Sequence, residues 1–154
     1  MQIQPPSAHT VRQEGSQLSI QGTSGPDRIR VIQNADQIQV QVNGHETVIP
    51  AAELERVVIA GGDGDDDIAL IDNREGKGLR HLSLYVDGGA GDDLIGTGKG
   101  NDTVDGGTGD DEIYDQGGHN QLRGGIGDDF ISARGRHTRY EGGPVTTCAP
   151  VTAP

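Results

Sequence analysis

The chain has 154 residues, of which 31% are hydrophobic, and it carries a formal net charge of −12 at pH 7. This composition leaves little apolar area for a conventional globular core, and it is typical of disordered chains unless a cation neutralises the carboxylates. The acidity also argues against binding to nucleic acid or to anionic membranes, and no apolar run reaches the roughly 20 residues of a membrane span.

The N-terminal region is expected to be a flexible arm followed by a β segment. Residues 1–16 are polar and contain Pro5 and Pro6, without the basic start and apolar stretch of a secretory signal peptide. Between residues 17 and 60, apolar and polar side chains alternate, as they do in half-buried strands. Asn43-Gly44 lies between two such runs and predicts a two-residue hairpin turn. We expect this segment to cap the region that follows it.

The region from residue 88 to residue 141 consists of nine-residue repeats, and such periods indicate a repeat architecture. The units are 88 GGAGDDLIG, 97 TGKGNDTVD, 106 GGTGDDEIY, 115 DQGGHNQLR, 124 GGIGDDFIS and 133 ARGRHTRYE. Their sixth position is usually Asp, and their eighth is Ile95, Val104, Ile113, Leu122, Ile131 and Tyr140. Because a disordered acidic linker would not keep an apolar residue in every eighth place, the pattern predicts a folded repeat region.

Two further matches precede these units. The segment 61 GGDGDDDIA fits the same frame, and residues 70–78 between it and the later units are expected to form an inserted surface loop. A match outside the frame is 22 GTSGPDRIR. The repeat region is therefore expected to cover 61–141, with a frayed tail over 142–154.

Each unit predicts a tight turn followed by a short strand. Glycine permits the left-handed φ values of such turns, and two units make a coil of eighteen residues whose turns stack at about the strand spacing of 4.8 Å. Ca²⁺ takes 6–8 oxygen ligands from carboxylates and carbonyls, which two stacked Gly/Asp turns can supply. There is no Cys/His cluster of the zinc type. His119 and His137 share one repeat position and could hold a transition metal, although a solvated pair is favoured.

The eighteen-residue coil divides the turns into two columns. The first column contains the turns that begin at residues 88, 106 and 124, and it predicts two cation sites between stacked turns. The second column contains those at 97, 115 and 133, where Asp102 is followed by Asn120 and Thr138, and it predicts one weak site. The turn at 61 lies 36 residues before the one at 97, so its phase assigns it to the second column.

These units resemble the RTX, or haemolysin-type, calcium-binding repeats, whose motif is G-G-x-G-x-D-x-U-x. The resemblance implies an all-β fold, a right-handed parallel β-roll, with Ca²⁺ held by backbone carbonyls and by the sixth-position Asp of two stacked turns. It also implies a secreted, extracellular bacterial protein. The candidate calcium ligands are Gly88, Ala90, Asp93, Gly106, Gly107, Thr108, Gly109, Asp111, Gly125, Gly127, Asp129, Asp102 and Asp66.

The function expected from the sequence is Ca²⁺ binding coupled to folding, in a structural or secretion-associated module. One alternative is a module that binds an anionic or neutral polysaccharide, because the RTX resemblance allows it. Another is a fragment of a larger secreted toxin or enzyme. Neither HExxH nor GxSxG occurs, and no Ser/His/Asp set lies in a recognisable context, so no catalytic site is expected.

Overall fold

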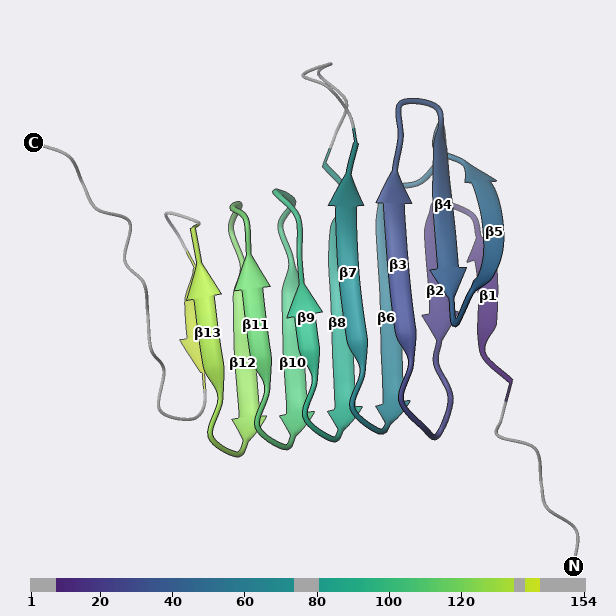
Figure 1. The fold of residues 1–154 in the computed structure, drawn as a ribbon. Coiled ribbons are helices and arrows are strands. Elements are labelled where there is room, and N and C mark those ends of the chain that lie inside the picture. Colours follow the sequence, from purple (N-terminus) through teal and green to yellow (C-terminus); the bar gives the residue numbers. More distant parts are fainter. Residues whose placement is uncertain (1–7, 74–80, 135–137, 142–154) are drawn as a thin grey trace, which may run out of the picture.

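The chain folds into two seven-stranded β-sheets that face one another (Figure 1). The computed structural model describes residues 8–73, 81–134 and 138–141. One sheet contains, in spatial order, β1 (Thr10–Glu14), β2 (Gln17–Gln21), β6 (Arg56–Asp63), β8 (Ser83–Ala90), β10 (Thr103–Thr108), β12 (Gln121–Ile126) and β14 (Arg139–Glu141). The other contains β13 (Phe130–Ala133), β11 (Glu112–Asp115), β9 (Leu94–Gly96), β7 (Asp67–Asp72), β3 (Arg28–Gln33), β4 (Gln37–Val42) and β5 (His45–Pro50).

The repeat region passes alternately from one sheet to the other, so that each coil gives one strand to each sheet. Neighbouring strands within the repeat region are parallel, and residues eighteen apart pair with one another, as Val86, Val104 and Leu122 do. The predicted parallel β-roll is therefore confirmed. Within the described residues, no helix is long and apolar enough to cross a membrane.

The core is a stack of aliphatic side chains between the sheets. The eighth repeat positions lie there, and Ile95, Ile113 and Ile131 are fully buried. Alternation places the next residues on the outer faces, because successive side chains of a strand point to opposite sides. Each later coil contributes few large apolar residues, so the C-terminal part of the core is thin.

The N-terminal strands extend the same two sheets. β2 pairs in parallel with β6, and β3 pairs in parallel with β7, so residues 17–33 form the first coil of the roll. The antiparallel strands β4 and β5 continue the second sheet, and β1 pairs antiparallel with β2. The predicted turn at Asn43-Gly44 is confirmed, with φ values of 50° and 83°. The expected boundary at residue 60 falls inside β6.

The turn at residue 61 lies in the first column, and its assignment to the second column is wrong. Gly62 pairs with Gly89, so turn 61–66 stacks directly on turn 88–93. The path from Asp67 to Tyr85 is nine residues longer than the equivalent path from Leu94 to Thr103. An insertion of nine residues preserves the repeat frame but moves the earlier turn to the opposite column. Residues 70–72 of the expected loop continue β7, and residues 74–78 lie outside the described residues.

Candidate metal centre

Five turns stack along one edge of the roll, at the lower end of the strands in Figure 1. They are residues 22–27, 61–66, 88–93, 106–111 and 124–129. The first column thus contains the three turns expected from the sequence and the two turns before them. Each turn leaves a strand of one sheet and enters a strand of the other. The sixth residue of each turn is an aspartate, and these five aspartates are at most 5% exposed.

The glycines of the motif leave room for the neighbouring turn. The second and fourth positions of the later four turns have left-handed φ values, such as 113° at Gly89 and 129° at Gly91. A Cβ atom on Gly89 would lie closer than 3.0 Å to the carbonyl oxygen of Gly62 in the preceding turn. Both the backbone conformation and the stacking distance therefore require glycine at these positions.

A ladder of hydrogen bonds links the buried aspartates. The N–H of Asp66 donates to Asp93 Oδ1 at 2.8 Å, that of Asp93 to Asp111 Oδ1 at 2.9 Å, and that of Asp111 to Asp129 Oδ1 at 3.1 Å. The N–H of Asp27 donates to Asp66 Oδ1 in the same way. Oδ1 of each carboxylate thus accepts a backbone N–H of the preceding turn, which leaves Oδ2 available for another partner.

That second oxygen is buried and has no hydrogen-bond partner within the described part of the chain. This holds for Oδ2 of Asp66, Asp93, Asp111 and Asp129. Burial of an unpaired charged oxygen is costly, so a native structure normally supplies a partner such as a cation.

Each oxygen without a hydrogen-bond partner lies beside the first glycine of its own turn. The missing side chain of this glycine leaves a space between two adjacent turns, which we call the cradle. A Cβ atom on Gly88 would lie closer than 3.0 Å to Asp93 Oδ2 and to the carbonyl oxygen of Gly106 in the next turn. Gly106 relates in the same way to Asp111 Oδ2 and to the carbonyl oxygen of Gly124. Carboxylate and carbonyl oxygens of adjacent turns therefore converge, and this is the donor set that Ca²⁺ prefers.

The electrostatics of the column also favour a cation. Burial raises the pKa of Asp66 to about 6, that of Asp93 to about 7 and that of Asp111 to about 6, and neighbouring aspartates add to each increase. Among the described residues, no three His, Cys, Asp or Glu side chains converge on one point. A cation here would therefore take one carboxylate from a turn and complete its shell with backbone carbonyls.

A second, exposed ladder runs along the outside of the same column. The N–H of Asp92 donates to Asp65 Oδ1 at 3.0 Å, and those of Asp110 and Asp128 donate at 2.8 Å to Asp92 Oδ1 and Asp110 Oδ1. These fifth-position carboxylates increase the negative potential around the buried ladder, and this favours cation capture.

The second column has a different arrangement at the equivalent places. Asp102 is buried, its Oδ1 accepts the N–H of Leu84 at 2.9 Å, and its N–H donates to Asn120 Oδ1 at 2.8 Å. Burial raises the pKa of Asp102 to about 6. The first position is Thr97 or Asp115 rather than glycine, and Thr97 Oγ1 donates to Asp115 Oδ1 at 3.0 Å. Residues with side chains thus stand where the first column has glycine, although Asp102 Oδ2 is also buried without a hydrogen-bond partner among the described residues. The weak site expected here stays a prediction.

Comparison with protein families identifies the repeats. The family model of the RTX calcium-binding nonapeptide repeat, which spans four copies, matches residues 85–104 and 96–131. Residues 85–131 are RTX calcium-binding repeats. No curated protein and no solved structure matches the chain. Turns 22–27 and 61–66 lie outside the matched RTX residues, yet they continue the first column.

The structure places twelve of the thirteen predicted ligand residues in the first column. These are Asp66, Gly88, Ala90, Asp93, Gly106, Gly107, Thr108, Gly109, Asp111, Gly125, Gly127 and Asp129. Asp102 lies in the second column, as expected, whereas the assignment of the turn that contains Asp66 to that column is wrong. The prediction omitted Gly61 and Gly124, although both occupy the same first position as Gly88. The sequence predicted two gaps between the turns of the first column, because it assigned three turns to this column. The structure has five turns there, which leave four gaps between them.

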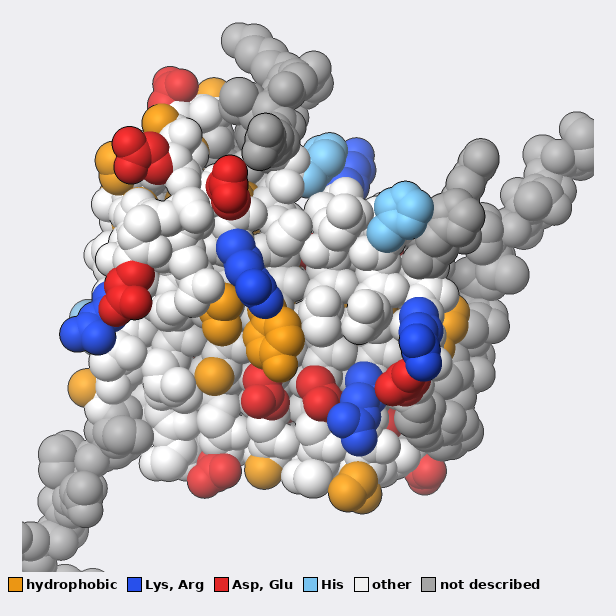
Figure 2. All heavy atoms as spheres, turned by 180° about the vertical axis from the view of Figure 1, so that it is seen from behind, with side chains coloured by type: hydrophobic (Ala, Val, Ile, Leu, Met, Phe, Trp, Pro, Cys, Tyr) orange, Lys and Arg blue, Asp and Glu red, His pale blue; other side chains and the backbone are white. Residues whose placement is uncertain are grey.

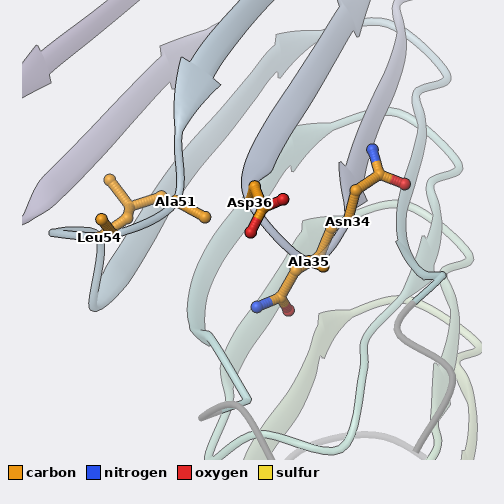
Figure 3. A pocket seen from close by; sticks show the side chains of 7 residues that line it. Asn34, Ala35, Asp36, Ala51 and Leu54 are labelled. Atoms are coloured by element: carbon orange, nitrogen blue, oxygen red, sulfur yellow. The ribbon is translucent and has the colours of Figure 1, made fainter. Parts of the chain in front are cut away.

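A hollow elsewhere in the molecule has the wrong chemistry for this cation. It has a volume of about 450 Å³ and lies between the β3–β4 turn and the β5–β6 connection (Figure 3). Its labelled side chains are Asn34, Ala35, Asp36, Ala51 and Leu54, with one carboxylate among them. It opens at the end of β3 opposite the first column, so it is not part of the RTX site.

The pH dependence of calcium binding follows from the raised pKa values. In the metal-free roll, protons stabilise these buried carboxyls fully below about pH 4, and this stabilisation is lost as the pH rises through 6 to 7. Ca²⁺ competes with those protons, so its affinity should fall as the pH falls through the same range. Between about pH 7.5 and about pH 5.5, we expect the calcium midpoint from circular dichroism to rise by about tenfold or more. Equal midpoints would contradict the assignment of these carboxyls as ligands.

Proposed function

We propose that this chain is a structural calcium-binding module whose repeat region folds when Ca²⁺ binds. The observation that carries the proposal is the row of buried Asp Oδ2 atoms that face carbonyl oxygens of the next turn. Without a cation, stacked carboxylates about 4.8 Å apart repel one another in a dry environment. With Ca²⁺, the same atoms form its ligand shell, and the binding energy becomes folding energy.

The thin C-terminal core supports the same proposal. Strand β9 contains three residues and buries one large apolar side chain, Ile95. Strand β11 buries Ile113 as its one aliphatic residue. This apolar area does little to offset the chain entropy of ordering a coil, so the turns need an additional source of stability.

The proposal predicts selectivity for Ca²⁺ over Mg²⁺. Backbone carbonyls of two turns make a large, irregular shell, whereas Mg²⁺ requires near-octahedral geometry and dehydrates reluctantly. At equal millimolar concentrations, circular dichroism should show a gain of β-structure with Ca²⁺ and little change with Mg²⁺. Full folding in Mg²⁺ alone would contradict the ligand set, and calorimetry on the same samples would separate binding from folding.

The proposed setting is outside the bacterial cell. RTX repeats are typical of secreted bacterial proteins, and extracellular calcium modules commonly have dissociation constants of about 10⁻⁴–10⁻³ M. A repeat region with such an affinity would stay unfolded where Ca²⁺ is scarce and would fold after export. We propose no catalytic role, and the module could also serve as part of a larger secreted protein.

Polysaccharide binding is a second candidate, favoured by one feature of the outer face of the first sheet. Tyr85 is 39% exposed there, and its neighbours across the strands are Thr103 and Gln121. They line a shallow depression of about 160 Å³. Arginines on this face alternate with acidic groups (Figure 2), and Arg123 Nη1 lies 3.4 Å from Asp105 Oδ2. A neutral polysaccharide therefore fits better than an anionic one.

The candidate can be tested by affinity electrophoresis with Ca²⁺ present. The wild-type chain should be retarded in gels that contain a neutral glucan, and Tyr85→Ala should migrate without retardation. Arg56 lies over the Tyr85 ring at 5.6 Å, and this ring is the aromatic surface among the described residues that line the depression. If the wild-type chain migrates equally in gels with and without the glucan, this candidate function is wrong. If the glucan retards both chains equally, Tyr85 is not the binding residue.

A further inference from the structure

The first turn of the column differs from the other four, because protein donors surround its aspartate. The carboxylate of Asp27 is 3% exposed. Its Oδ2 accepts the backbone N–H of Thr23 at 2.5 Å, and Thr23 Oγ1 lies 3.1 Å from the same oxygen. Its Oδ1 accepts a hydrogen bond from Nδ2 of Asn43 at 2.5 Å. Both oxygens are thus satisfied without a cation.

The amide of Asn43 is fixed in this position by its hairpin. Asn43 has a left-handed φ of 50°, which asparagine tolerates. Its Oδ1 accepts the N–H of Arg28 at 2.8 Å, and its own N–H donates to the carbonyl oxygen of Arg28 at 3.0 Å. Because Oδ1 is occupied by a donor, Nδ2 is directed at Asp27. The β4–β5 hairpin therefore places a neutral donor against the outer end of the ladder.

The second turn differs from the first at its second position. In turn 61–66, the second position is Gly62, and Asp66 Oδ2 has no hydrogen-bond partner within the described residues. In turn 22–27, the second position is Thr23, which supplies both its N–H and its hydroxyl to Asp27. Two residues, Thr23 and Asn43, thus do at the first turn what a cation would do at the next.

The coil around this turn, together with β4, also buries more aliphatic side chains than any later coil. Five aliphatic side chains of β3 and β4 are at most 1% exposed, namely Ile29, Val31, Ile38, Val40 and Val42. β3 contributes two of them and β4 three, whereas each of the strands β9 to β12 buries one. The N-terminal coil therefore combines a larger apolar core with a turn that contains no unpaired carboxylate.

We propose that the β4–β5 hairpin closes the first turn in place of a cation, so that the N-terminal coil stays folded without Ca²⁺. The later turns then fold onto this coil as Ca²⁺ fills the gaps, starting with the gap between turns 61–66 and 88–93. This proposal rests on calcium-coupled folding only for its second step. Asp27 Oδ2 and the carbonyl oxygen of Gly61 converge at Gly22 as their equivalents do at Gly88, so only the donors around Asp27 distinguish this gap. The proposal implies that the gap between turns 22–27 and 61–66 takes no ion.

Hydrogen exchange read by mass spectrometry, on the full chain in excess chelator, tests the proposal. Amides of β2 to β5 should be protected, whereas those of β9 to β13 should exchange freely until Ca²⁺ is added. Asn43→Gly keeps the left-handed turn but removes the amide, and it should lower the protection of β2 to β5 in chelator by about ten- to hundredfold, as expected for a lost hydrogen bond to a charged group. Asn34→Gly, in the neighbouring β3–β4 turn, is the control for the flexibility of glycine.

The outcomes separate the two proposals. Free exchange of β2 to β5 in chelator, with Ca²⁺-dependent protection of β9 to β13, would overturn the closed N-terminal turn but leave calcium-coupled folding intact. Equal protection of all strands in chelator would overturn calcium-coupled folding and with it the second step of the proposal, in which the later turns fold onto the N-terminal coil. An unchanged pattern in Asn43→Gly, or an equal loss in Asn34→Gly, would show that the amide does not hold the turn.

Discussion

Asp111→Ala and Asp93→Ala are expected to weaken calcium-dependent folding most among single aspartate variants. Asp111 serves two gaps, because its Oδ1 accepts the N–H of Asp93 and its Oδ2 faces the carbonyl of Gly124. Asp93 is placed in the same way between Asp66 and Gly106. Removal of either should raise the calcium midpoint by at least about tenfold, the effect of losing one interaction with a charged group. Circular dichroism during a calcium titration measures it.

The other aspartates provide the ranking and the control. Asp129 ends the ladder and should have an intermediate effect, and Asp102 in the second column should have the smallest of the four. Asp105→Ala removes the same charge from the outer face, where its pair with Arg123 is solvent-exposed and contributes little. If Asp102→Ala or Asp105→Ala shifts the midpoint as far as Asp111→Ala, the placement of the sites in the first column is wrong.

Gly106→Ala is expected to be as damaging as the loss of an aspartate, although it changes no charge. The added Cβ would lie closer than 3.0 Å to Asp111 Oδ2 and to the fixed carbonyl oxygen of Gly124. It would therefore fill the cradle in which the two donors converge. Gly106 does not have a left-handed φ, so backbone strain does not confuse the result. We expect one fewer bound Ca²⁺ by calorimetry and a midpoint raised by at least about tenfold, comparable with the loss of a charged ligand.

Gly96→Ala is the matched control for this variant. Gly96 lies in β9, also lacks a left-handed φ, and a Cβ there would meet its nearest atom at 3.8 Å, an ordinary contact. Its calcium midpoint and stoichiometry should equal those of the wild-type chain. If Gly106→Ala binds the same number of ions as Gly96→Ala, the cradle is not the calcium position.

The nine-residue period of the sequence predicts much of this structure. It predicts the parallel roll of the later units, because apolar residues in the eighth position, such as Ile95 and Ile113, stack in register when two units make one coil of eighteen residues. It also predicts the buried aspartates of the later turns. The short-range signal at Asn43-Gly44 predicts its hairpin, since few dipeptides adopt two consecutive left-handed residues.

The remaining features depend on tertiary contacts or on an ambiguous period. A nine-residue insertion before β8 is invisible in a nine-residue frame, so the sequence could not place Asp66 in its column. The contact of Asn43 with Asp27 joins two residues across a hairpin, and no repeat pattern contains it. The difference at Thr97 does have a sequence signal, which is the loss of glycine at the first repeat position.

A calorimetric calcium titration of the full chain, read beside circular dichroism, tests the central claim most directly. The first column has three gaps in which a buried Oδ2 without a hydrogen-bond partner in the described chain faces the next turn, at Asp66, Asp93 and Asp111. We therefore expect three ions to bind together with a gain of β-structure. An unchanged spectrum between chelator and millimolar Ca²⁺, or the absence of saturable binding heat, would contradict the account.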